Sequence, residues 1–508
     1  MTDDLDVLAA PRVSRSLWLA ADFLRIARPK RDANIAGITL DSRRVRPGDL
    51  YVALPGANAH GAKFLGQAVA SGAVAAFTDP AGAALARQSD ANAELPMLIA
   101  PDPRVVLGPL SAWVFGDPAT KLKTIAVTGT NGKTTVTTLI EAAIRCCGDS
   151  VGAIGTTGVR VDGVTMPSAR TTPEAPELQG MLAAMVARGV DVVAMEVSSH
   201  ALVLSRVDGI VFDESIFTNL GHDHLDFHSD AEAYFAAKSS LFVGARTQHA
   251  LINIDDKWGR RLFAATDVSA RTYSVDLAKA NWHAAAITPD GIGWHYQLLG
   301  PGINQRSATT LPGRFNVANA VAAAAAAISC GYPASAVARG IANCSGAPGR
   351  MEQIEGGSGV CAVVDYAHTP DAVAAAAAVG RELADRRGGR LLIVIGAGGD
   401  RDAAKRPQMG RAAAVVADEV VITDDNPRTE DPAAIRAAIR SGATGHAAAV
   451  SEVADRREAI ADTVARADSA DVVMVIGKGH ETGQEINNVV FPMDDRELVR
   501  AALRARSE

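Results

Sequence analysis

The sequence predicts an α/β protein of three domains. Its 508 residues exceed what one hydrophobic core usually holds, and a composition of 48% hydrophobic and 21% charged residues is ordinary for a globular protein. Apolar runs of strand length alternate with helical patterns, which favours parallel sheets covered by helices. Turn-forming stretches at 116–118 and 345–349 divide this alternation. We therefore expect domains at 1–117, 118–346 and 347–508.

The first domain is expected to be a small α/β unit. Residues 1 to about 33 fit a frayed start and one helix. Two apolar runs within 35–59 flank the turn Pro47-Gly48-Asp49, and 63–71 fits a helix.

The central domain opens with a candidate phosphate-binding loop. An apolar run at 125–127 precedes GTNGKT at 129–134, and a helical pattern follows. Strand, glycine-rich turn and helix in this order place backbone N–H groups and a helix N-terminus against anionic oxygens. The match to G-x-x-x-x-G-K-[ST] is incomplete because the first glycine would fall at Val127. An ordinary glycine-containing turn is the alternative.

Two side chains near this loop indicate ATP and Mg²⁺ as ligands. Lys133 would place a full positive charge beside the terminal phosphates, and the Thr134 hydroxyl can ligate Mg²⁺. The apolar run at 190–197 predicts a second buried strand that ends near Glu196. A carboxylate at that end of a parallel strand suits a Mg²⁺ ligand.

The rest of the central domain is expected to complete a P-loop ATPase-type parallel sheet. A helix begins near Asp230 and carries Lys238, and 280–309 predicts β structure that is antiparallel. An alanine-rich helix at 316–330 closes the domain. Further strands are expected at 212–219, 250–253 and 272–275.

The C-terminal domain is expected to be a Rossmann-like, doubly wound domain. Four predicted strands alternate with helical patterns, and a polar loop follows each strand. Because parallel strands end at one edge of their sheet, the four loops should gather there and form a binding site. The strands are predicted at 361–365, 391–395, 419–423 and 472–476.

The totals exclude several classes of protein. A formal net charge of −7 does not favour nucleic acid as a partner. No apolar run reaches the roughly 18 residues of a membrane-spanning helix, and the acidic start MTDDLDVLAA is unlike a signal peptide. The five cysteines form no C-x-x-C pair, which predicts buried thiols in a reducing compartment. We expect a cytoplasmic protein.

Six motifs carry a family resemblance that spans nearly the whole chain. They are GTNGKT at 129–134, EVSSH at 196–200, TNL at 218–220 followed by DHLD at 223–226, NVAN at 316–319, GRME at 349–352 and DYAHTP at 365–370. Together they resemble the Mur ligases, ATP-dependent enzymes that form amide bonds in cell-wall precursors. The shorter phosphate loop is the family's own form. Within the family, the chain resembles the members that add meso-diaminopimelate to UDP-N-acetylmuramoyl-L-alanyl-D-glutamate.

The resemblance assigns site residues in four groups. It implies an ATP site formed by Gly129, Thr130, Asn131, Gly132, Lys133, Thr134, Thr135, Asn316, Arg350 and Asp365. It implies contacts to the UDP-linked precursor from Leu40, Ser42, Thr171, Thr172, Ser198 and Arg206. It implies contacts to diaminopimelate from Arg401, Asp425, Asn426, Pro427, Arg428, Gly477 and Glu481. The implied metal ligands are Thr134, Glu196, His224 and a carbamylated Lys238, and the implied catalytic residues are Lys133, Glu196, His224 and Lys238.

The implied reaction couples ATP cleavage to amide formation. A carboxylate does not react with an amine at neutral pH, whereas an acyl phosphate made from ATP does. The protein mainly positions groups and neutralises charge. Arg428 is expected to bind the distal carboxylate of diaminopimelate, because arginine pairs bidentately with carboxylates, and Glu481 its distal ammonium.

Several alternatives remain open at this point. A lysine-adding ligase of the same family should lack the DNPR sequence at 425–428, and a folylpolyglutamate synthase should lack a uridine-nucleotide domain. A P-loop switch protein, from another functional class, would hydrolyse nucleotide in response to a macromolecule. A catalytically inactive binding protein is disfavoured, because the candidate catalytic residues are all present: Lys133, Thr134, Glu196 and His224. We expect a monomeric enzyme of peptidoglycan synthesis, and hence of cell shape and division, that neither binds nucleic acid nor inserts into membranes.

Overall fold

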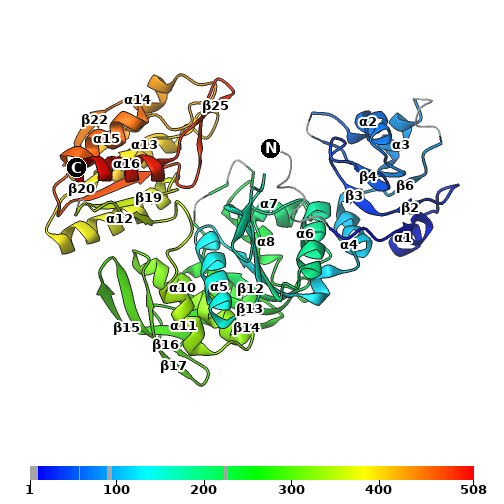
Figure 1. Ribbon diagram of the computed structural model, residues 1–508, viewed down its shortest axis with the longest axis horizontal. Helices are drawn as coiled ribbons and strands as arrows, with labels where there is room; N and C mark the ends of the chain where they lie inside the picture. Colours follow the sequence, from blue (N-terminus) through cyan, green and yellow to red (C-terminus); the bar gives the residue numbers. More distant parts are fainter. Residues whose placement is uncertain are drawn as a thin grey trace.

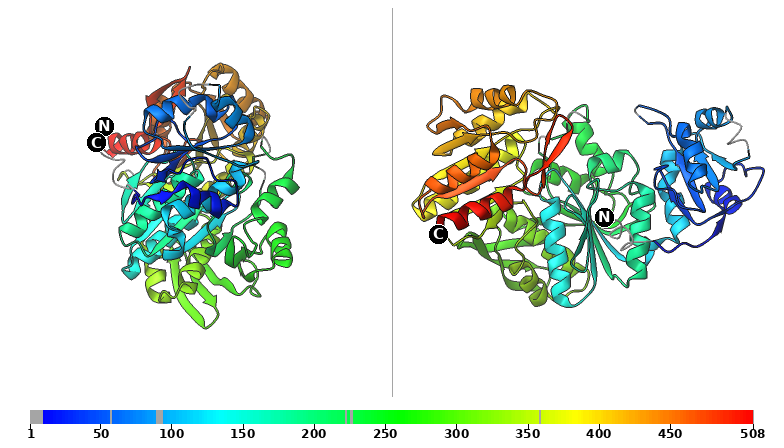
Figure 2. Two further views of the ribbon diagram at one scale, coloured as in Figure 1. Left: turned by 90° about the vertical axis from the view of Figure 1, so that its right-hand side faces the viewer. Right: turned by 45° about the horizontal axis from the view of Figure 1, so that its top comes forward.

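Three sheets with helices on both faces organise the chain (Figure 1). The structure is a computed structural model that describes residues 10–56, 58–88, 94–221, 223–224, 227–357 and 359–507. The N-terminal and C-terminal sheets lie at opposite ends of the central one (Figures 1 and 2). The three-domain α/β fold predicted from the sequence is confirmed. No helix in the described ranges is long and apolar enough to cross a membrane.

The N-terminal sheet has four parallel strands. They are β3 (Gly37–Thr39), β4 (Asp49–Ala53), β5 (Ala75–Thr78) and β6 (Met97–Ile99). Leu50 and Val52 pack toward α1 (Leu17–Leu24) and α4 (Pro103–Phe115), as alternation along a strand requires. Tyr51 packs on the other face, with η2 (Gly61–Phe64), α2 (Leu65–Ala70) and α3 (Pro80–Ala86). A short pair, β1 (Arg15–Ser16) and β2 (Asn34–Ile35), flanks α1.

The central sheet has 11 strands and is larger than the predicted parallel sheet. Its parallel part is formed by β8 (Val151–Gly155), β11 (Val192–Glu196), β7 (Lys123–Thr128), β12 (Phe212–Phe217), β13 (Thr247–Asn253), β14 (Ser269–Ser274) and β15 (Trp282–Asp290). Antiparallel strands extend both edges: β9 (Gly158–Val161) and β10 (Val164–Met166) on one side, β16 (Gly293–Gly300) and β17 (Ile303–Thr309) on the other. The antiparallel β structure expected at 280–309 is confirmed.

Two helical layers cover the central sheet. Ile125 and Val127 of β7 pack against one layer and Ala126 against the other, so this strand is apolar on both faces. The first layer contains α5 (Lys133–Cys147), α10 (Arg314–Ser329) and α11 (Ala334–Ala342). The second contains α6 (Ala175–Ala187), α7 (Ser199–Val203), α8 (Ala231–Ser239) and α9 (Lys257–Ala265).

The C-terminal sheet has six strands where the sequence predicted four. The predicted strands are β19 (Cys361–Asp365), β20 (Leu391–Ile395), β21 (Glu419–Ile422) and β23 (Val472–Ile476), and all of them run parallel. The additional edge strands are β18 (Glu352–Ile354) and β22 (Ala449–Glu452). The covering helices are α12 (Pro370–Arg387), α13 (Lys405–Ala414) and α14 (Pro432–Ala443) on one face, and α15 (Arg456–Arg466) and α16 (Asp495–Ser507) on the other.

A separate hairpin follows the last strand of this sheet. It consists of β24 (Gly483–Ile486) and β25 (Val489–Pro492), and the sequence analysis did not anticipate it. The two residues between the strands, Asn487 and Asn488, have φ of +49° and +64°. Left-handed residues at both central positions are typical of a tight two-residue hairpin turn.

The cysteines depart in part from the sequence expectation. All five are free thiols, and Cys344 and Cys361 are buried as expected. Cys146 is exposed, because it lies on the solvent face of α5, two residues beyond the buried Ile144. The expectation of a buried thiol is therefore wrong for Cys146.

Candidate active site

The phosphate-loop candidate connects β7 to α5, and two of its glycines are required by the geometry. Gly129 has φ +149°, and a Cβ atom there would lie 1.9 Å from the Thr218 hydroxyl. Gly132 has φ +88°, and a Cβ atom would lie 2.6 Å from the Asn319 side-chain oxygen. Any larger residue would force the loop away from its neighbours.

The loop that follows β12 holds this turn in place. The Thr218 hydroxyl donates to the carbonyl of Asn131 at 2.6 Å. The backbone N–H groups of Thr130 and Asn131 donate to the main-chain and side-chain oxygens of Asn219, both at 2.9 Å. The TNL motif therefore has a structural role, which is to fix the phosphate loop from the neighbouring strand.

Lys133 begins α5 with its ammonium folded over the loop. Its Nζ donates to the carbonyl oxygens of Gly129 and Thr130, both at 2.9 Å. Burial lowers the pKa of Lys133 from its ordinary value, against the opposing effect of the carboxylates of Glu196 and Asp223. The ammonium is thus at the position where phosphate oxygens would replace carbonyl oxygens as its acceptors.

Glu196 ends β11 as a buried carboxylate, as the sequence predicted. Its two oxygens accept hydrogen bonds from the backbone N–H of Thr156 at 2.8 Å and from the Thr156 hydroxyl at 3.1 Å. Thr156 follows β8, the neighbouring strand, and was not anticipated. It fixes the orientation of Glu196 toward the cavity that both residues line.

Lys238 lies in α8 and is fully buried. Its Nζ donates to the carbonyl of Gly129 at 2.8 Å and lies 4.6 Å from the ring centroid of Tyr234. Burial, followed by the charge of Lys133, lowers the pKa of Lys238 well below its ordinary value. Lys238 is therefore a buried helix residue and does not lie on the solvated face of α8. Only the uncharged form of an amine reacts with CO₂ to give a carbamate, and the lowered pKa of Lys238 favours that form.

His224 and Asp223 line the same cavity as the phosphate loop. His224 has φ +54°, and its Nε2 lies 3.5 Å from an Asp223 carboxylate oxygen. Burial acts to raise the pKa of Asp223, but His224, His368 and Lys133 together lower it below its ordinary value. His222, Leu225 and Asp226 of the predicted motif lie outside the described residues.

The C-terminal domain contributes a cation and a carboxylate. The guanidinium of Arg350 lies 4.4 Å from the ring centroid of Tyr366, and its buried Nε has no hydrogen-bond partner among the described residues. The Asp365 carboxylate accepts from the backbone N–H groups of Met351 and Ala367 at 2.7 and 2.8 Å. Burial raises the pKa of Asp365 despite the neighbouring Arg350.

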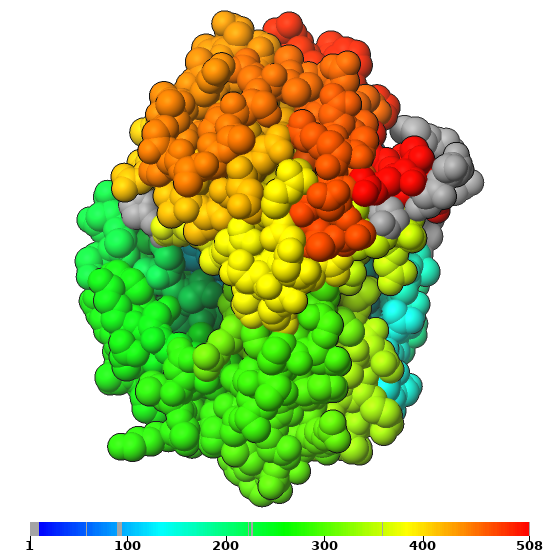
Figure 3. All heavy atoms as spheres, turned by 90° about the vertical axis from the view of Figure 1, so that its left-hand side faces the viewer, coloured from blue at the N-terminus to red at the C-terminus, as the bar shows by residue number. Residues whose placement is uncertain are grey.

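These side chains line one cavity of about 430 Å³ between the central and C-terminal domains. Figure 3 shows the C-terminal domain resting on the central domain, with a hollow between them. Most of the predicted ATP and metal residues line the cavity: Thr130, Asn131, Gly132, Lys133, Thr134, Thr135, Glu196, His224, Lys238, Asn316, Arg350 and Asp365. Asn316 is buried in α10 and donates to the carbonyl of Pro312, which precedes the helix, at 2.7 Å.

The oxygen donors in this cavity fit Mg²⁺. Glu196 supplies a carboxylate and Thr134 a hydroxyl, both buried and both lining the cavity. No group of three His, Cys, Asp or Glu side chains with metal-ligand geometry occurs in the part of the chain that the structure describes. Mg²⁺ keeps waters and phosphate oxygens among its ligands and needs only one or two protein carboxylates. The residues present therefore suit an ion held jointly with a nucleotide.

The predicted precursor contacts divide between two domains. In the central domain, the Thr172 hydroxyl accepts from the Ser198 N–H at 3.1 Å, and Thr171 bonds the Thr156 hydroxyl. Arg206 pairs with Glu174 at 2.9 Å. The other two residues lie in the N-terminal domain: Leu40 follows β3, and the Ser42 hydroxyl donates to Gln67 at 3.0 Å.

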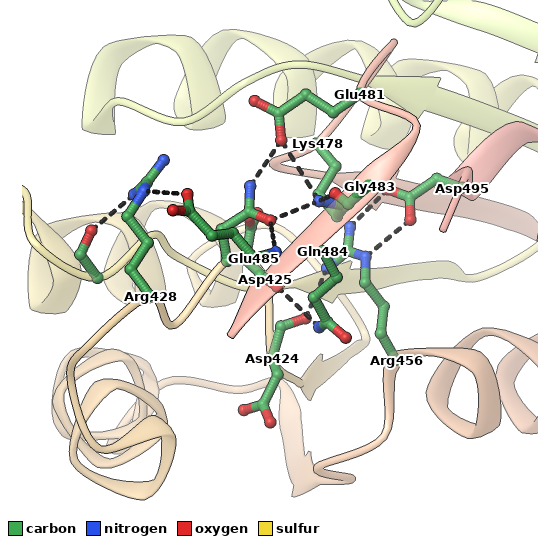
Figure 4. A network of polar contacts seen from close by, with 12 residues as sticks. Asp424, Asp425, Arg428, Arg456, Lys478, Glu481, Gly483, Gln484, Glu485 and Asp495 are labelled. Carbon is green, nitrogen blue, oxygen red and sulfur yellow. Dashed lines mark hydrogen bonds and ion pairs between the residues drawn. The ribbon is translucent and has the colours of Figure 1, made fainter. Parts of the chain in front are cut away.

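The predicted amino-acid contacts cluster on loops of the C-terminal sheet (Figure 4). Asn426 donates to a Glu481 carboxylate oxygen at 2.7 Å, and the buried Lys478 ammonium contacts both residues at 3.1 and 3.3 Å. Gly477, at φ +118°, passes close to Asp425. The remaining members are Pro427, which is buried, Arg428, which is partly exposed, and Arg401, which is exposed on the loop after β20.

Three family models match the chain in succession. They are the Mur ligase family catalytic domain at residues 34–112, the Mur ligase middle domain at 127–327, and the Mur ligase glutamate ligase domain at 349–479. Together they cover more than half of the chain. The chain belongs to the Mur ligase family. It is therefore an ATP-dependent acid–amino-acid ligase that forms ADP.

Individual relatives resemble this Mur ligase over almost their full length. It is 47% identical over 490 residues to UDP-N-acetylmuramoyl-L-alanyl-D-glutamate–2,6-diaminopimelate ligase of Streptomyces coelicolor, covering 95% of each chain. It is 46% identical over 489 residues to the protein of the same name from Corynebacterium efficiens, covering 94% of this chain and 91% of the relative. A solved structure of that name matches with a TM-score of 0.69 and 33% identity, covering 98% of this chain and all of the other.

Sequence reasoning gave several polar residues of the site no role of their own. Besides Thr156, they include Asp223, His368, Lys478 and Glu485. Thr156, Asp223, His368 and Lys478 belong to loops after strands, and the loops of His368 and Lys478 were predicted to be polar. Their position at strand ends was the available signal. Glu485 belongs to the hairpin β24–β25, for which the only signal was the Asn-Asn turn.

Proposed function

We propose that this Mur ligase joins meso-diaminopimelate to UDP-N-acetylmuramoyl-L-alanyl-D-glutamate in peptidoglycan precursor synthesis, as a monomer in the cytoplasm. One observation carries the proposal. The loop Asp425-Asn426-Pro427-Arg428 lies on the same sheet edge as Glu481, and the Lys478 ammonium joins Asn426 to Glu481 there. An arginine beside a carboxylate suits an amino acid whose far end carries both a carboxylate and an ammonium. The named relatives support the same substrate pair.

The reaction proceeds in two steps. A carboxylate oxygen of the acceptor attacks the γ-phosphorus of ATP, and the bond to ADP breaks, which leaves an acyl phosphate. The amine of diaminopimelate then attacks the acyl carbon, loses a proton and displaces inorganic phosphate. The protein's part in both steps is to position the groups and to neutralise phosphate charge.

The phosphate loop and the C-terminal domain would hold the nucleotide from two sides. Lys133 would exchange the Gly129 and Thr130 carbonyls for phosphate oxygens, and the loop's N–H groups would face the same anion. Arg350, whose Nε has no hydrogen-bond partner in the described ranges, would contact the nucleotide from the opposite wall. Asn316 and Asp365 would contact adenosine. To do so, each would give up a hydrogen bond within the protein and form one with the nucleotide.

Glu196, Thr134 and His224 would hold Mg²⁺ beside the phosphates. A bound Mg²⁺ would polarise the phosphoryl oxygens and neutralise the charge that develops during transfer. Thr156 keeps both oxygens of Glu196 aligned for this role. Lys238 would carry a carbamate, formed when its neutral nitrogen bonds to the carbon of CO₂ and loses a proton. That carbamate would help to hold the metal and would place an anion beside the Lys133 ammonium.

The precursor would lie between the N-terminal and central domains. Leu40 and Ser42 would meet the uridine diphosphate, and the Thr171, Thr172, Ser198 and Arg206 group would meet the peptide. Arg206 already pairs with Glu174, so only the unpaired part of its guanidinium is available to a carboxylate.

An amino-acid panel tests the proposed function. The enzyme is incubated with ATP, Mg²⁺ and the UDP-muramoyl dipeptide, and ADP release is followed with meso-diaminopimelate, L-lysine, D-alanine or no amino acid. We expect release with meso-diaminopimelate and a kcat/KM at least about thirtyfold lower with L-lysine, because lysine leaves Arg428 without a carboxylate. An equal or higher kcat/KM for L-lysine contradicts the proposal and favours a lysine-adding ligase.

A further inference from the structure

The hairpin β24–β25 holds Arg428 in an uncommon backbone conformation. Arg428 has φ +52°, a left-handed region that is unfavourable for a residue with a Cβ atom. Its N–H donates to the carbonyl of Glu485 at 2.9 Å, and its carbonyl accepts from the N–H of Asn487 at 2.7 Å. Both partners belong to the hairpin and its turn. The hairpin, rather than the loop alone, therefore stabilises this conformation.

The side chain of Arg428 is held at two points. Its Nε donates to Glu485 Oε2 at 3.0 Å, and its Nη1 donates to the carbonyl of Gly399 at 2.6 Å. Figure 4 shows Glu485 beside the guanidinium. Nη2 has no protein partner among the residues that the structure describes, and the side chain is 22% exposed. Two fixed points orient the planar group and leave its free end for a ligand.

The same hairpin contacts the rest of the amino-acid loops. The N–H of Glu485 donates to the side-chain oxygen of Asn426 at 2.9 Å. The buried Lys478 ammonium donates to the Gly483 carbonyl at 2.6 Å. Gln484 donates to the Asp425 carbonyl at 2.7 Å. Each residue from Gly483 to Glu485 thus contacts the amino-acid loops.

Glu485 has two opposing effects on a bound carboxylate. Its own charge competes for the Arg428 cation, while its hydrogen bond fixes the cation in one orientation. Competition is limited, because Glu485 occupies only one of the five N–H groups of the guanidinium and is itself 35% exposed to solvent. Fixing the orientation removes the conformational entropy that a free arginine would lose on binding. The orienting effect should therefore dominate.

We propose that Glu485 is a positioning residue of the amino-acid site, which acts through Arg428 and so sets the preference for a substrate with a distal carboxylate. This inference rests on the proposed function, because the carboxylate in question is that of meso-diaminopimelate. Glu485 itself need not touch the substrate. Its contribution is the contact between its carboxylate oxygen and Nε of Arg428.

Two substitutions separate the contact from the charge. Glu485→Asp keeps the charge but withdraws the oxygen from Arg428, whereas Glu485→Gln removes the charge and keeps an oxygen that accepts from Nε. KM and kcat for meso-diaminopimelate are measured at saturating ATP and acceptor. We expect Glu485→Asp and Glu485→Ala to raise KM about three- to tenfold with kcat within about twofold, the effect of freeing one long side chain. Glu485→Gln should restore a nearly wild-type KM.

The Arg428→Ala background tests whether Glu485 acts through Arg428. Adding Glu485→Ala to Arg428→Ala should change KM no further, because the contact is already lost. Glu497→Ala is the matched control: Glu497 also pairs with an arginine, Arg500, at 2.6 Å, but on α16 and outside the site. Its KM should equal that of the wild type.

Three outcomes overturn the inference. A lower or unchanged KM in both Glu485→Asp and Glu485→Ala shows that the carboxylate only competes or does nothing. A raised KM in Glu485→Gln equal to that of Glu485→Ala assigns the effect to charge. An equal rise in the Arg428→Ala background assigns it to another residue. These failures differ from failure of the proposed function, in which the wild type itself does not prefer meso-diaminopimelate over L-lysine.

Discussion

Lys133 shows how a single side chain is prepared for a ligand. Its side chain is half-buried, and its ammonium donates to two carbonyl oxygens of its own loop. Burial lowers the pKa of this ammonium, and the nearby carboxylates of Glu196 and Asp223 offset part of that effect. Carbonyl oxygens are weaker partners for an ammonium than phosphate oxygens. Under the proposed function, an arriving phosphate would replace these weak acceptors by strong ones.

Replacing Lys133 should remove activity and spare the fold. We expect Lys133→Ala to lower kcat for ADP release by at least about a hundredfold, the range seen when a charge-stabilising donor is lost. The melting temperature should stay within a few degrees, because the two lost hydrogen bonds lie in a loop. Lys123→Ala, at the other end of β7, is the control and should retain turnover. A folded Lys133→Ala enzyme with near-normal turnover would exclude Lys133 from phosphate binding.

Glu214, near the start of the interior strand β12, links stability to pH. Burial raises the pKa of Glu214 to about 7, against the lowering effect of Arg271 at 2.6 Å. The groove around it, about 420 Å³, also contains Lys123, Asp213 and His249. The folded chain binds this proton more tightly than the unfolded chain, so the stability due to protonated Glu214 is present below the unfolded pKa of 4.5 and is lost as pH rises through about 7.

The Glu214→Gln variant should therefore be more stable than the wild type only at higher pH. We expect nearly equal urea midpoints near pH 4, below the unfolded pKa, and a gain on the order of 2–4 kcal/mol near pH 8, since one unit of pKa corresponds to about 1.4 kcal/mol. Unfolding is followed by tryptophan fluorescence at both pH values. Glu232→Gln, from an exposed pair with Arg261, is the control and should show no such pH dependence. A gain independent of pH would show that Glu214 does not titrate as described.

At the scale of elements, the predictable strands are those buried on both faces. The strands β19, β20 and β23 were predicted with the bounds that the structure has, because each is a continuous apolar run between polar loops. The strand β22 was missed because it is a short edge strand with little buried surface. The hairpin β24–β25 was missed because none of the four residues of β25 is buried.

The candidate site could be predicted from local patterns only where its residues lie at the ends of recognisable strands. Lys133 and Glu196 follow from strand and loop patterns, because the carboxyl ends of parallel strands converge. The family resemblance supplied most other residues. The contact between Glu485 and Arg428 joins positions 57 residues apart, and no local pattern encodes it. Such pairs depend on tertiary placement, which periodicity does not report.

At the scale of the whole molecule, the cavity is formed by two domains that meet around it. Lys133 and Asn316 belong to the central domain, and Arg350 and Asp365 to the C-terminal domain. Neither wall alone surrounds a nucleotide. A ligand that contacts both walls binds the closed arrangement more tightly than any open one, and so it shifts the population toward closure. The connection between the walls contains Gly346 and Gly349, both with positive φ, at +90° and +63°.

Closure should be visible as a smaller radius of gyration. A compact chain of 508 residues has a radius of gyration of about 23 Å. The free protein, with its domains in a row, should exceed this value and move toward it when a non-hydrolysable ATP analogue and the acceptor are added, as small-angle X-ray scattering would measure. Arg350→Ala removes the cation of one wall and leaves the phosphate loop intact, so it should bind the analogue with a reduced change in radius. Lys133→Ala is the control that prevents binding. An unchanged wild-type radius under saturating ligands would mean that the two domains are already in their nucleotide-bound arrangement, and that the glycines at 346 and 349 serve the turn alone.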